Sequence, residues 1–357
     1  QYYDNSYIEE EFINDILNYI EKEKIQFKWK KGDVLMIDNT IMMHSRNTYI
    51  PPRKLYTTVK GFPNFFYDKK LKTLPSWDTI PLIHFGTQNL DSPKESVMNA
   101  ILLGYEAIDC ASINGNEKEI GEGIKYGLKM SNMKREDIFI TSKLWSTYNE
   151  HVKEACQKSL EDLKLKYLDL YLIHSPVALQ YIPFGKKYPP EKEYQEIRNS
   201  RVPIQKVWFQ MEELVKKGLV KNIGVCNFPV SLLRDMLSYC TIPPSVAQFE
   251  TYPENTQLET LNFCKENDIH VSTVAPFGKV DYMGKHTIFE NEVVKNISEK
   301  YNCSPAQLLL SWARMNGFTT VTECNTFREM KEYSFHTELS RNDFEYLHTL
   351  NSKQLFY

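Results

Sequence analysis

The alternation of strand-like and helix-like segments is the feature that most constrains how this chain can fold. From residue 80 onward, short apolar runs are separated by stretches in which apolar residues recur at helical spacing. The eight runs are Ile80–Gly86, Glu106–Cys110, Ile138–Leu144, Leu168–His174, Asn222–Cys226, Ser245–Phe249, His270–Ala275 and Thr319–Thr322. Eight strand–helix units in about 280 residues favour an α/β fold, a closed (β/α)8 barrel. An open doubly wound sheet is the alternative, weakened because no G-x-G-x-x-G follows the first run.

Several of the intervening segments show where helices begin and end. The spacing predicts helices over Val152–Leu163 and Val207–Val220, and a last helix near Asn342–Leu350. A further helix, Ser304–Met315, opens with a Ser-Pro pair, which is typical of an N-cap and first helical position. The connection Val177–Val202 is unusually long, and we expect it to lie over the barrel mouth and shape what binds there.

The first 62 residues do not follow the βα pattern. Glu9–Ile20 has the spacing of an amphipathic helix, and short β-rich runs separated by turns follow it. We therefore predict three parts: a small β-rich segment at 1–62, a linker at 63–75 and the barrel at 76–357. The absence of an initiator Met suggests that the sequence begins within a longer protein.

Composition excludes several classes of function. Lys and Arg number 43 and Asp and Glu 46, so the net charge of −3 offers no basic surface for nucleic acid or anionic lipid. The sequence has no apolar stretch long enough for a membrane span and no secretion signal. The seven cysteines are scattered and form no C-x-x-C pair, which favours reduced thiols and a cytoplasmic location.

From Ile80 to Leu350 the chain resembles the aldo-keto reductase family at nine points in the same order. These are Ile80–Thr87, Gly104–Ala111, Gly115–Glu117 followed by Ile120-Gly121, Lys134–Trp145, Ser159-Leu160, Tyr167–Pro176, Gly218–Phe228, Gln248–Glu250 and Ser304–Gln307. The resemblance implies a barrel that reduces small carbonyl compounds with a nicotinamide cofactor.

The same resemblance implies a catalytic set at the ends of the early strands. Asp109, Lys143 and His174 match the family's Asp, Lys and His. In the family a Tyr protonates the alkoxide that hydride transfer creates, Lys and Asp make that Tyr more acidic, and His orients the carbonyl. Here the Tyr position is Asn114, and an amide cannot give up a proton at neutral pH. His174 is a replacement acid only if its pKa suits.

The implied cofactor cleft departs from the family pattern as well. Cys226, Asn227 and Gln248 correspond to the Ser-Asn and Gln that hold the nicotinamide amide, whereas Val274, followed by Ala275, replaces a ring that stacks on nicotinamide.

The basic residues of that cleft are also replaced. Glu323 takes the place of a Lys that grips the adenosine 2′-phosphate, and Glu329 that of an Arg, with Arg328 one place out of register. We expect weakened cofactor binding, with NADH favoured over NADPH.

The N-terminal segment resembles a second family. Phe27–Asn39, Met43–Arg46 and Pro51–Arg53 are similar to the C-terminal part of Fe(II)/2-oxoglutarate dioxygenases of the taurine-dioxygenase type, where a double-stranded β-helix ends. The resemblance implies that His44 binds iron and that Arg53, or less favourably Arg46, binds 2-oxoglutarate. Such a site needs a second His and a carboxylate, and no His precedes His44.

Two hypotheses about function follow. In the first, the chain is an oxidoreductase-lineage protein with impaired or lost reductase activity. In the second, the barrel is a pseudoenzyme scaffold or partner-binding module attached to a dioxygenase whose catalytic half lies upstream. The ligand at the mouth is then either a small carbonyl compound or a protein partner. The sequence does not identify the substrate or the oligomeric state.

Overall fold

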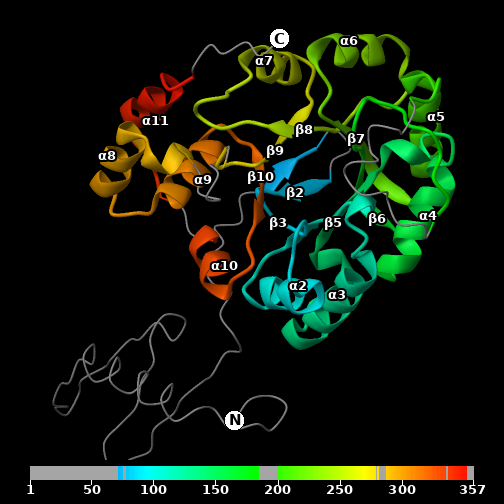
Figure 1. The fold of residues 1–357 in the computed structure, drawn as a ribbon, viewed down its shortest axis with the longest axis horizontal. Helices are drawn as coiled ribbons and strands as arrows, with labels where there is room; N and C mark the ends of the chain where they lie inside the picture. Colours follow the sequence, from blue (N-terminus) through cyan, green and yellow to red (C-terminus); the bar gives the residue numbers. More distant parts are fainter. Residues whose placement is uncertain are drawn as a thin grey trace, which may run out of the picture. The chain divides into compact units, whose positions relative to one another are not determined.

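The computed structural model describes residues 71–74, 78–184, 199–278, 280, 287–334 and 337–351. Eight parallel strands close into a barrel in the order β10-β3-β4-β5-β6-β7-β8-β9, which confirms the predicted (β/α)8 architecture (Figure 1). The barrel strands are β3 (Ile83–Gly86), β4 (Ala107–Asp109), β5 (Phe139–Leu144), β6 (Leu168–Ile173), β7 (Val220–Cys226), β8 (Val246–Glu250), β9 (His270–Val274) and β10 (Thr319–Glu323).

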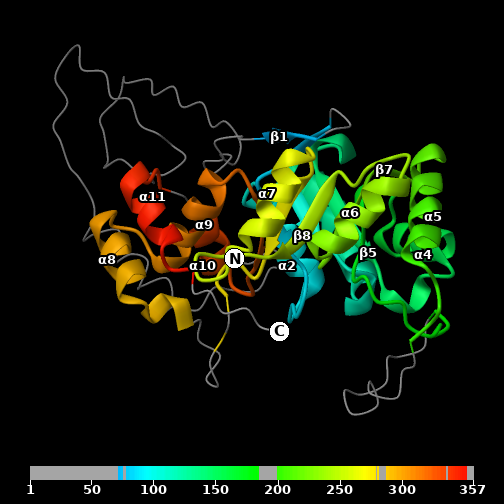
Figure 2. The same cartoon turned by 90° about the horizontal axis from the view of Figure 1, so that it is seen from above.

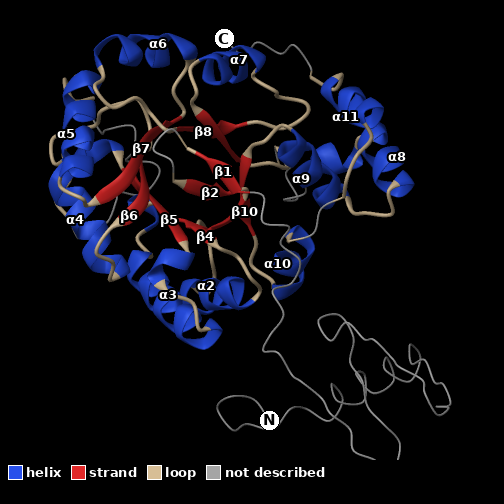
Figure 3. Cartoon of the chain, turned by 180° about the vertical axis from the view of Figure 1, so that it is seen from behind, coloured by secondary structure: helices blue, strands red, loops and turns tan. Residues whose placement is uncertain are grey.

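Helices surround the strands on the outside (Figure 3). They are α2 (Pro93–Leu102), α3 (Glu117–Ser131), α4 (Val152–Leu163), α5 (Ile204–Lys216), α6 (Val230–Tyr239), α7 (Leu258–Glu266), α8 (Glu292–Lys300), α9 (Pro305–Met315), α10 (Phe327–Tyr333) and α11 (Arg341–His348), with short 3-10 turns η1 (Ser112–Asn114), η2 (Arg135–Asp137), η3 (Ser146–Tyr148) and η5 (Thr287–Glu290).

Two of the predicted helices have their expected bounds, and the helix predicted near Asn342–Leu350 is α11, Arg341–His348. The helix α4 matches its prediction, and α9 begins after Ser304, whose hydroxyl accepts a hydrogen bond from the Gln307 N–H as an N-cap does. The prediction for 207–220 is wrong at both ends, because α5 starts at Ile204 and stops at Lys216, and Val220 already belongs to β7.

A two-stranded hairpin precedes the barrel. In it β1 (Leu71–Thr73), inside the segment predicted as a linker, pairs antiparallel with β2 (Thr79–Pro81), so Ile80 is not part of the first barrel strand (Figure 2). Leu74 and Ile80 are buried against side chains of the barrel interior, namely Ala107, Phe139, Leu170, Leu172 and Val246. The Pro81 carbonyl accepts a hydrogen bond of 3.1 Å from the hydroxyl of Thr319, the first residue of β10. The hairpin therefore fills the amino-terminal end of the barrel.

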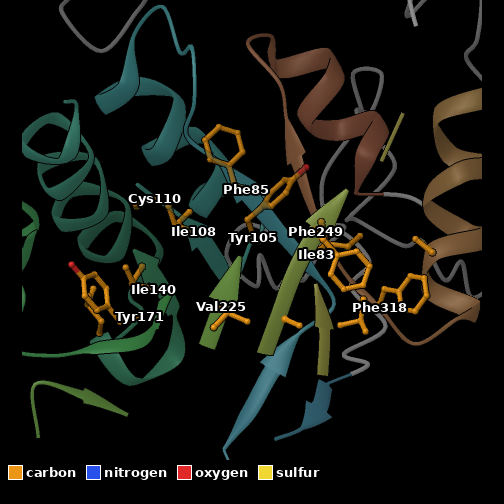
Figure 4. Close-up of a cluster of buried hydrophobic side chains, with 14 of the residues drawn as sticks. Ile83, Phe85, Tyr105, Ile108, Cys110, Ile140, Tyr171, Val225, Phe249 and Phe318 are labelled. Atoms are coloured by element: carbon orange, nitrogen blue, oxygen red, sulfur yellow. The ribbon is translucent and has the colours of Figure 1, made fainter. Parts of the chain in front are cut away.

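The larger core lies between the strands and the helices. Figure 4 shows part of it, with Phe85, Ile108, Ile140 and Tyr171 on successive strands. Phe85 meets Tyr105 edge to face, with ring centroids 5.7 Å apart. Aromatic pairs of this kind add roughly 1 kcal/mol to what area burial provides. This shell fixes the strands and hence the positions of the residues at their carboxyl ends.

One buried carboxylate connects the amino-terminal ends of β5, β6 and β7. Asp169 on β6 accepts hydrogen bonds from the Arg135 guanidinium (2.7 Å) and the Ile140 backbone N–H (2.9 Å), and Lys221 lies 2.9 Å from its other oxygen. The Tyr167 ring lies beneath both cations, 4.1 Å from the Arg135 guanidinium carbon and 4.6 Å from the Lys221 nitrogen. These contacts make Asp169 a structural residue far from the barrel mouth.

The C-terminal helix α11 is fixed by Asp343, and this contact gives a test of pH dependence. Hydrogen bonds from Lys300, Ser340 and Tyr301 lower the pKa of Asp343 to about 2. A carboxyl whose pKa is depressed by folding stabilises the fold above its unfolded-state pKa and loses that contribution as pH falls through the folded value. We expect Asp343→Asn to lower Tm at pH 5 and the difference from the parent to shrink toward pH 2. Thermal unfolding at stepped pH measures this, and a constant difference would contradict it.

The chain divides into two units, 1–60 and 61–357, and every described residue belongs to the second. The predicted helix Glu9–Ile20 and the candidate ligands His44 and Arg53 lie outside the described residues. The structure describes only the two ends of the long connection after β6, where Leu179 and Asn199 form an antiparallel bridge. Within the described ranges no helix has the length and apolarity needed to cross a bilayer, and all seven cysteines are free thiols.

Candidate active site

The candidate residues come together because they end neighbouring strands on the same face. In parallel ladders, paired residues point to the same side of the sheet, and alternate residues along a strand face the interior. The ladders pair Glu323 with Gly86, Gly86 with Asp109, and Asp109 with Thr141. On the other side of the barrel Cys226 pairs with Gln248 and Glu250 with Val274. The predicted site residues thus form one ring at the carboxyl end of the barrel.

A buried ion pair lies in this ring. The Lys143 ammonium donates to Asp109 Oδ1 and, over 3.1 Å, to the Cys110 carbonyl. Burial works to lower the pKa of Lys143, but the adjacent Asp109 carboxylate outweighs it and the pKa is raised. Lys143 therefore keeps its positive charge in a site that water scarcely reaches. Lys143 and Asp109 are thus ion-pair partners at the carboxyl end of the barrel.

Gln248 extends this pair across the barrel. Its amide nitrogen donates to Asp109 Oδ2 (3.0 Å) and to the Ser272 hydroxyl (3.2 Å), and its oxygen lies 3.6 Å from the Cys226 sulfur. Burial raises the pKa of the Cys226 thiol to about 12, so this cysteine is not a nucleophile at neutral pH. Gln248 thus links the Lys143–Asp109 pair to the side of the mouth that carries Cys226.

Asn114 is held at the mouth by contacts on both sides of it. The Ser112 hydroxyl donates to the Lys143 carbonyl (2.9 Å), and the Asn116 amide donates to the Thr87 carbonyl (2.8 Å). Thr87 in turn donates to the Asp109 carbonyl through its N–H (3.1 Å) and its hydroxyl (2.9 Å). The segment that carries Asn114 is therefore anchored to β5 through Ser112 and, through Asn116 and Thr87, to the end of β4.

His174 follows β6 and stays neutral. Burial, together with the nearby Lys143 charge, lowers its pKa to about 4. Its Nδ1 is buried with no hydrogen-bond partner in the described protein, and the Trp145 ring lies edge-on to it at 5.1 Å. An imidazole that is unprotonated at neutral pH orients a carbonyl by hydrogen bonding but has no spare proton. His174 therefore does not meet the condition for a replacement acid.

The residues expected to bind the nicotinamide lie on β7, β8 and β9. Asn227 is exposed with a left-handed φ of 60°, and its side-chain amide makes long contacts of 3.4 Å each to the His174 carbonyl and the Cys226 sulfur. Val274 ends β9 half-buried, and Ala275 after it has a φ of 47° that a residue with a Cβ rarely adopts. Amide donors and acceptors are thus present for a nicotinamide carboxamide, whereas the position expected for a stacking ring holds a branched aliphatic chain.

Glu329 has a contact that the sequence analysis did not include. Its Oε2 accepts hydrogen bonds from the Asn325 N–H (3.2 Å), the Thr326 N–H (3.0 Å) and the Thr326 hydroxyl (2.8 Å). The Thr326 hydroxyl also accepts from the Glu329 N–H, which completes a capping box at the start of α10. The donors of the turn into α10 are therefore bound to a carboxylate of the same chain, and Arg328 beside it is exposed.

Glu323 ends β10 at the rim of the mouth. Its side chain lies across Gly86, with Cγ 3.1 Å from where a Cβ at residue 86 would be. The protein atoms around its carboxyl, together with repulsion from Asp109, raise its pKa. An acidic side chain therefore stands at this point of the rim.

Several residues that support the site were not predicted from the sequence. Thr87, Ser112 and Asn116 position the mouth, and their only sequence signal is that they follow a strand end or flank Asn114. Glu117 is buried with its two carboxyl oxygens on the Ser142 (2.7 Å) and Ser159 (2.9 Å) hydroxyls. It ties α3 to β5 next to Lys143.

A closed (β/α)8 barrel with a buried lysine–carboxylate pair at its carboxyl end has the architecture of a barrel enzyme. Residues 82–351 match the aldo/keto reductase family model, and residues 1–59 match the model of the taurine catabolism dioxygenase TauD, TfdA family. The NAD(P)H-dependent D-xylose reductase of Candida tenuis is 37% identical over 289 residues, which cover 76% of this chain and 90% of the relative.

A second relative, the NADPH-dependent aldose reductase GRE3 of Saccharomyces cerevisiae, is 38% identical over 271 residues, 70% of this chain and 83% of that protein. The solved aldose reductase from Schistosoma japonicum superposes with a TM-score of 0.73 at 34% identity, covering 80% of this chain and 94% of that one. The chain belongs to the aldo/keto reductase family of oxidoreductases.

Proposed function

We propose that this barrel descends from nicotinamide-dependent carbonyl reductases and that its reductase activity is impaired or lost. The observation that carries the proposal is Asn114, which takes the place of the family's proton-donating Tyr, in a turn that Ser112 and Asn116 anchor to the Lys143 and Thr87 carbonyls. The names of the relatives support a nicotinamide cofactor and a small carbonyl substrate. The seven free cysteines support a cytoplasmic location.

The residues at the barrel mouth retain part of the chemistry of carbonyl reduction. A reduced nicotinamide, when bound, supplies a hydride. Lys143, kept charged by Asp109, stabilises negative charge on a carbonyl oxygen, and neutral His174 orients that oxygen. Asn114 donates a hydrogen bond but no proton. Loss of a general acid costs about 10²- to 10⁴-fold in rate where nothing replaces it.

The residues expected around the adenosine of the cofactor support weakened cofactor binding, with NADH favoured over NADPH. Glu323 stands where a cation is needed, and Glu329 already occupies the donors of the turn into α10. NADH lacks the 2′-phosphate and so escapes the repulsion from both carboxylates. The aliphatic Val274 gives either cofactor no ring to stack on, which costs roughly 1 kcal/mol.

The proposal is tested by restoring the missing phenol. We expect Asn114→Tyr alone to give no detectable NADPH-dependent reduction of a small aldehyde, because the cofactor cleft is altered as well. The measurement is NADPH oxidation at 340 nm with millimolar cofactor, using Asn114→Tyr combined with Lys143→Met as the inactive control. Turnover in Asn114→Tyr that Lys143→Met removes would show that the cofactor cleft still works. Robust reduction by the parent chain would refute the loss of activity.

A second candidate function rests on the match of residues 1–59 to the TauD model. In it the barrel is a scaffold or a partner-binding module, and an Fe(II)/2-oxoglutarate dioxygenase supplies catalysis, with His44 as an iron ligand and Arg53 as the 2-oxoglutarate ligand. The cheapest test is the genomic sequence upstream of Gln1. An H-x-D/E motif 100 or more residues before His44 supports this function, and its absence there refutes it.

A further inference from the structure

We propose that the barrel interior contains a binding site for one water molecule, formed by His84 and Thr141 below the Lys143–Asp109 pair. The carbonyl chemistry discussed above uses neither His84 nor Thr141. The inference goes beyond the proposed function, because it holds whether or not the mouth binds a nicotinamide. It assigns a ligand to two polar side chains that lie deep inside the barrel.

His84 faces the interior of the barrel. Its neighbours on β3, Ile83 and Phe85, belong to the outer core between strands and helices, so the side chain between them points inward. The imidazole lies next to Phe139, an interior residue of β5, with ring centroids 5.5 Å apart. Only 1% of the surface of His84 is exposed to solvent. The ring is therefore enclosed by protein in the centre of the barrel.

Small residues separate His84 from Asp109. Gly86 lies two residues after His84 on β3 and pairs with Asp109, and Ala107 lies two residues before Asp109 on β4. All four positions face the same side of the sheet, and two of them carry a hydrogen or a methyl group as the side chain. No bulky side chain of β3 or β4 therefore stands between the imidazole and the carboxylate. Thr141 pairs with Asp109 from β5 and adds a hydroxyl group beside it.

The polar atoms of these two side chains are buried without a hydrogen-bond partner among the described residues. They are Nδ1 and Nε2 of His84 and Oγ1 of Thr141. His270 on β9 differs, since its Nε2 lies 2.8 Å from the Thr319 hydroxyl. The Pro81 carbonyl raises the pKa of His84 without reaching hydrogen-bond geometry, which makes the nitrogen facing it the N–H donor. The other ring nitrogen is then an acceptor, and it needs a donor that the described residues do not supply.

One water molecule satisfies these atoms. It accepts a hydrogen bond from the Thr141 hydroxyl and donates one to the acceptor nitrogen of His84. Its second proton goes to Asp109, whose oxygens keep free lone pairs beside the bonds from Lys143 and Gln248. Buried waters make about three hydrogen bonds of this kind to groups that otherwise lack partners. The water thereby connects His84 to the ion pair.

The charges at this site favour a neutral ligand over an ion. Burial lowers the pKa of His84 to about 4 against the opposing influence of Asp109, so the ring is neutral at pH 7. The Lys143 ammonium already neutralises Asp109 and repels a second cation. The described part of the chain also contains no cluster of side chains suited to a metal ion. A small neutral molecule that both donates and accepts hydrogen bonds fits these conditions.

The first test is Thr141→Val in the full chain, which removes the hydroxyl and keeps the shape of the side chain. If the hydroxyl is bonded to a water, its loss should shift the unfolding equilibrium toward the unfolded state about 5-fold in urea titrations. If the hydroxyl is dry, valine leaves the equilibrium unchanged or favours the folded state, because no hydrogen bond is lost. That result would overturn the proposal. Circular dichroism verifies that each variant is folded.

A double-mutant cycle tests whether the two residues share the ligand. His84→Phe keeps a ring and removes both nitrogens. We expect the effect of His84→Phe with Thr141→Val to be about 5-fold smaller than the product of the single effects, because either change removes the same bridge. The matched control is Thr256→Val, another buried hydroxyl without a described partner, in the segment after β8. Its effect should multiply with that of His84→Phe, and the same behaviour in Thr141→Val would count against a shared water.

A crystal structure of the parent chain gives a direct answer that needs no variant. We expect an ordered water within hydrogen-bond distance of both Thr141 Oγ1 and a ring nitrogen of His84. A site without solvent density, a direct bond between the two side chains, or a water that reaches only one of them would overturn the proposal. None of these results bears on cofactor binding, which the NADPH assay measures separately.

Discussion

The double variant Glu323→Lys and Glu329→Arg is expected to bind NADPH at least about 100-fold more tightly than the parent chain does. Each substitution replaces a repulsion of the 2′-phosphate by an attraction. At about 4 Å and an effective dielectric near 20, one unit charge pair contributes roughly 4 kcal/mol before salt screening. Solvent exposure at the rim reduces this interaction energy. About 1.4 kcal/mol of binding free energy from each of the two sites is enough for the 100-fold change in NADPH affinity.

The measurement is a fluorescence titration with NADPH and NADH at low and at high salt. The gain for NADPH should shrink at high salt, because salt screens the attraction between the added cations and the phosphate. Glu329→Arg also removes the acceptor of the α10 cap, at a cost of about 1 kcal/mol in stability. Glu329→Gln, which keeps an acceptor oxygen, separates the charge effect from the cap. An unchanged NADPH affinity would contradict the assignment of this turn to the adenosine end.

The second large effect concerns stability. We expect Asp169→Asn to lower the free energy of unfolding by about 1–3 kcal/mol, because the carboxylate is buried while its partners Arg135 and Lys221 are partly exposed. The change leaves Arg135 without its 2.7 Å partner and weakens the acceptor of the Ile140 N–H and of Lys221. Equilibrium urea unfolding measures the loss.

Two controls sharpen this test. The exposed Glu213→Gln should leave the urea midpoint unchanged, because its partner Lys216 lies in solvent. Asp169→Asn should also leave ligand affinity at the mouth unaltered, since Asp169 belongs to the opposite part of the barrel. A loss below 1 kcal/mol would show that the three donors find water or other acceptors without cost.

The sequence revealed the barrel because each strand is an apolar run bounded by polar residues, and burial on both faces requires that pattern. It did not reveal the hairpin. The run Ile80–Gly86 is continuous in composition, yet the chain turns at Leu82, so that Ile80 pairs with Lys72 and Ile83 with Thr320. The division of this run into two strands depends on which distant segments each half pairs with. The local pattern of apolar residues does not contain that information.

The structure brings three of the predicted site residues into contact, whereas the sequence did not indicate how their neighbours connect them. Strand-end positions placed Asp109, Lys143 and Gln248 together, because parallel strands bring their carboxyl ends to one face. The neutral state of His174 depends on burial by Trp145 and on the Lys143 charge, which only the tertiary structure supplies. Glu329 is different, since Thr326 followed three residues later by Glu is a capping-box signature that the sequence already displayed.

The hairpin that fills the floor of the barrel limits access to its interior. Since Leu74 and Ile80 fill the amino-terminal end, whatever reaches the Lys143–Asp109 pair does so from the rim. Access to this pair is therefore governed by the residues and loops that follow the strands at the carboxyl end.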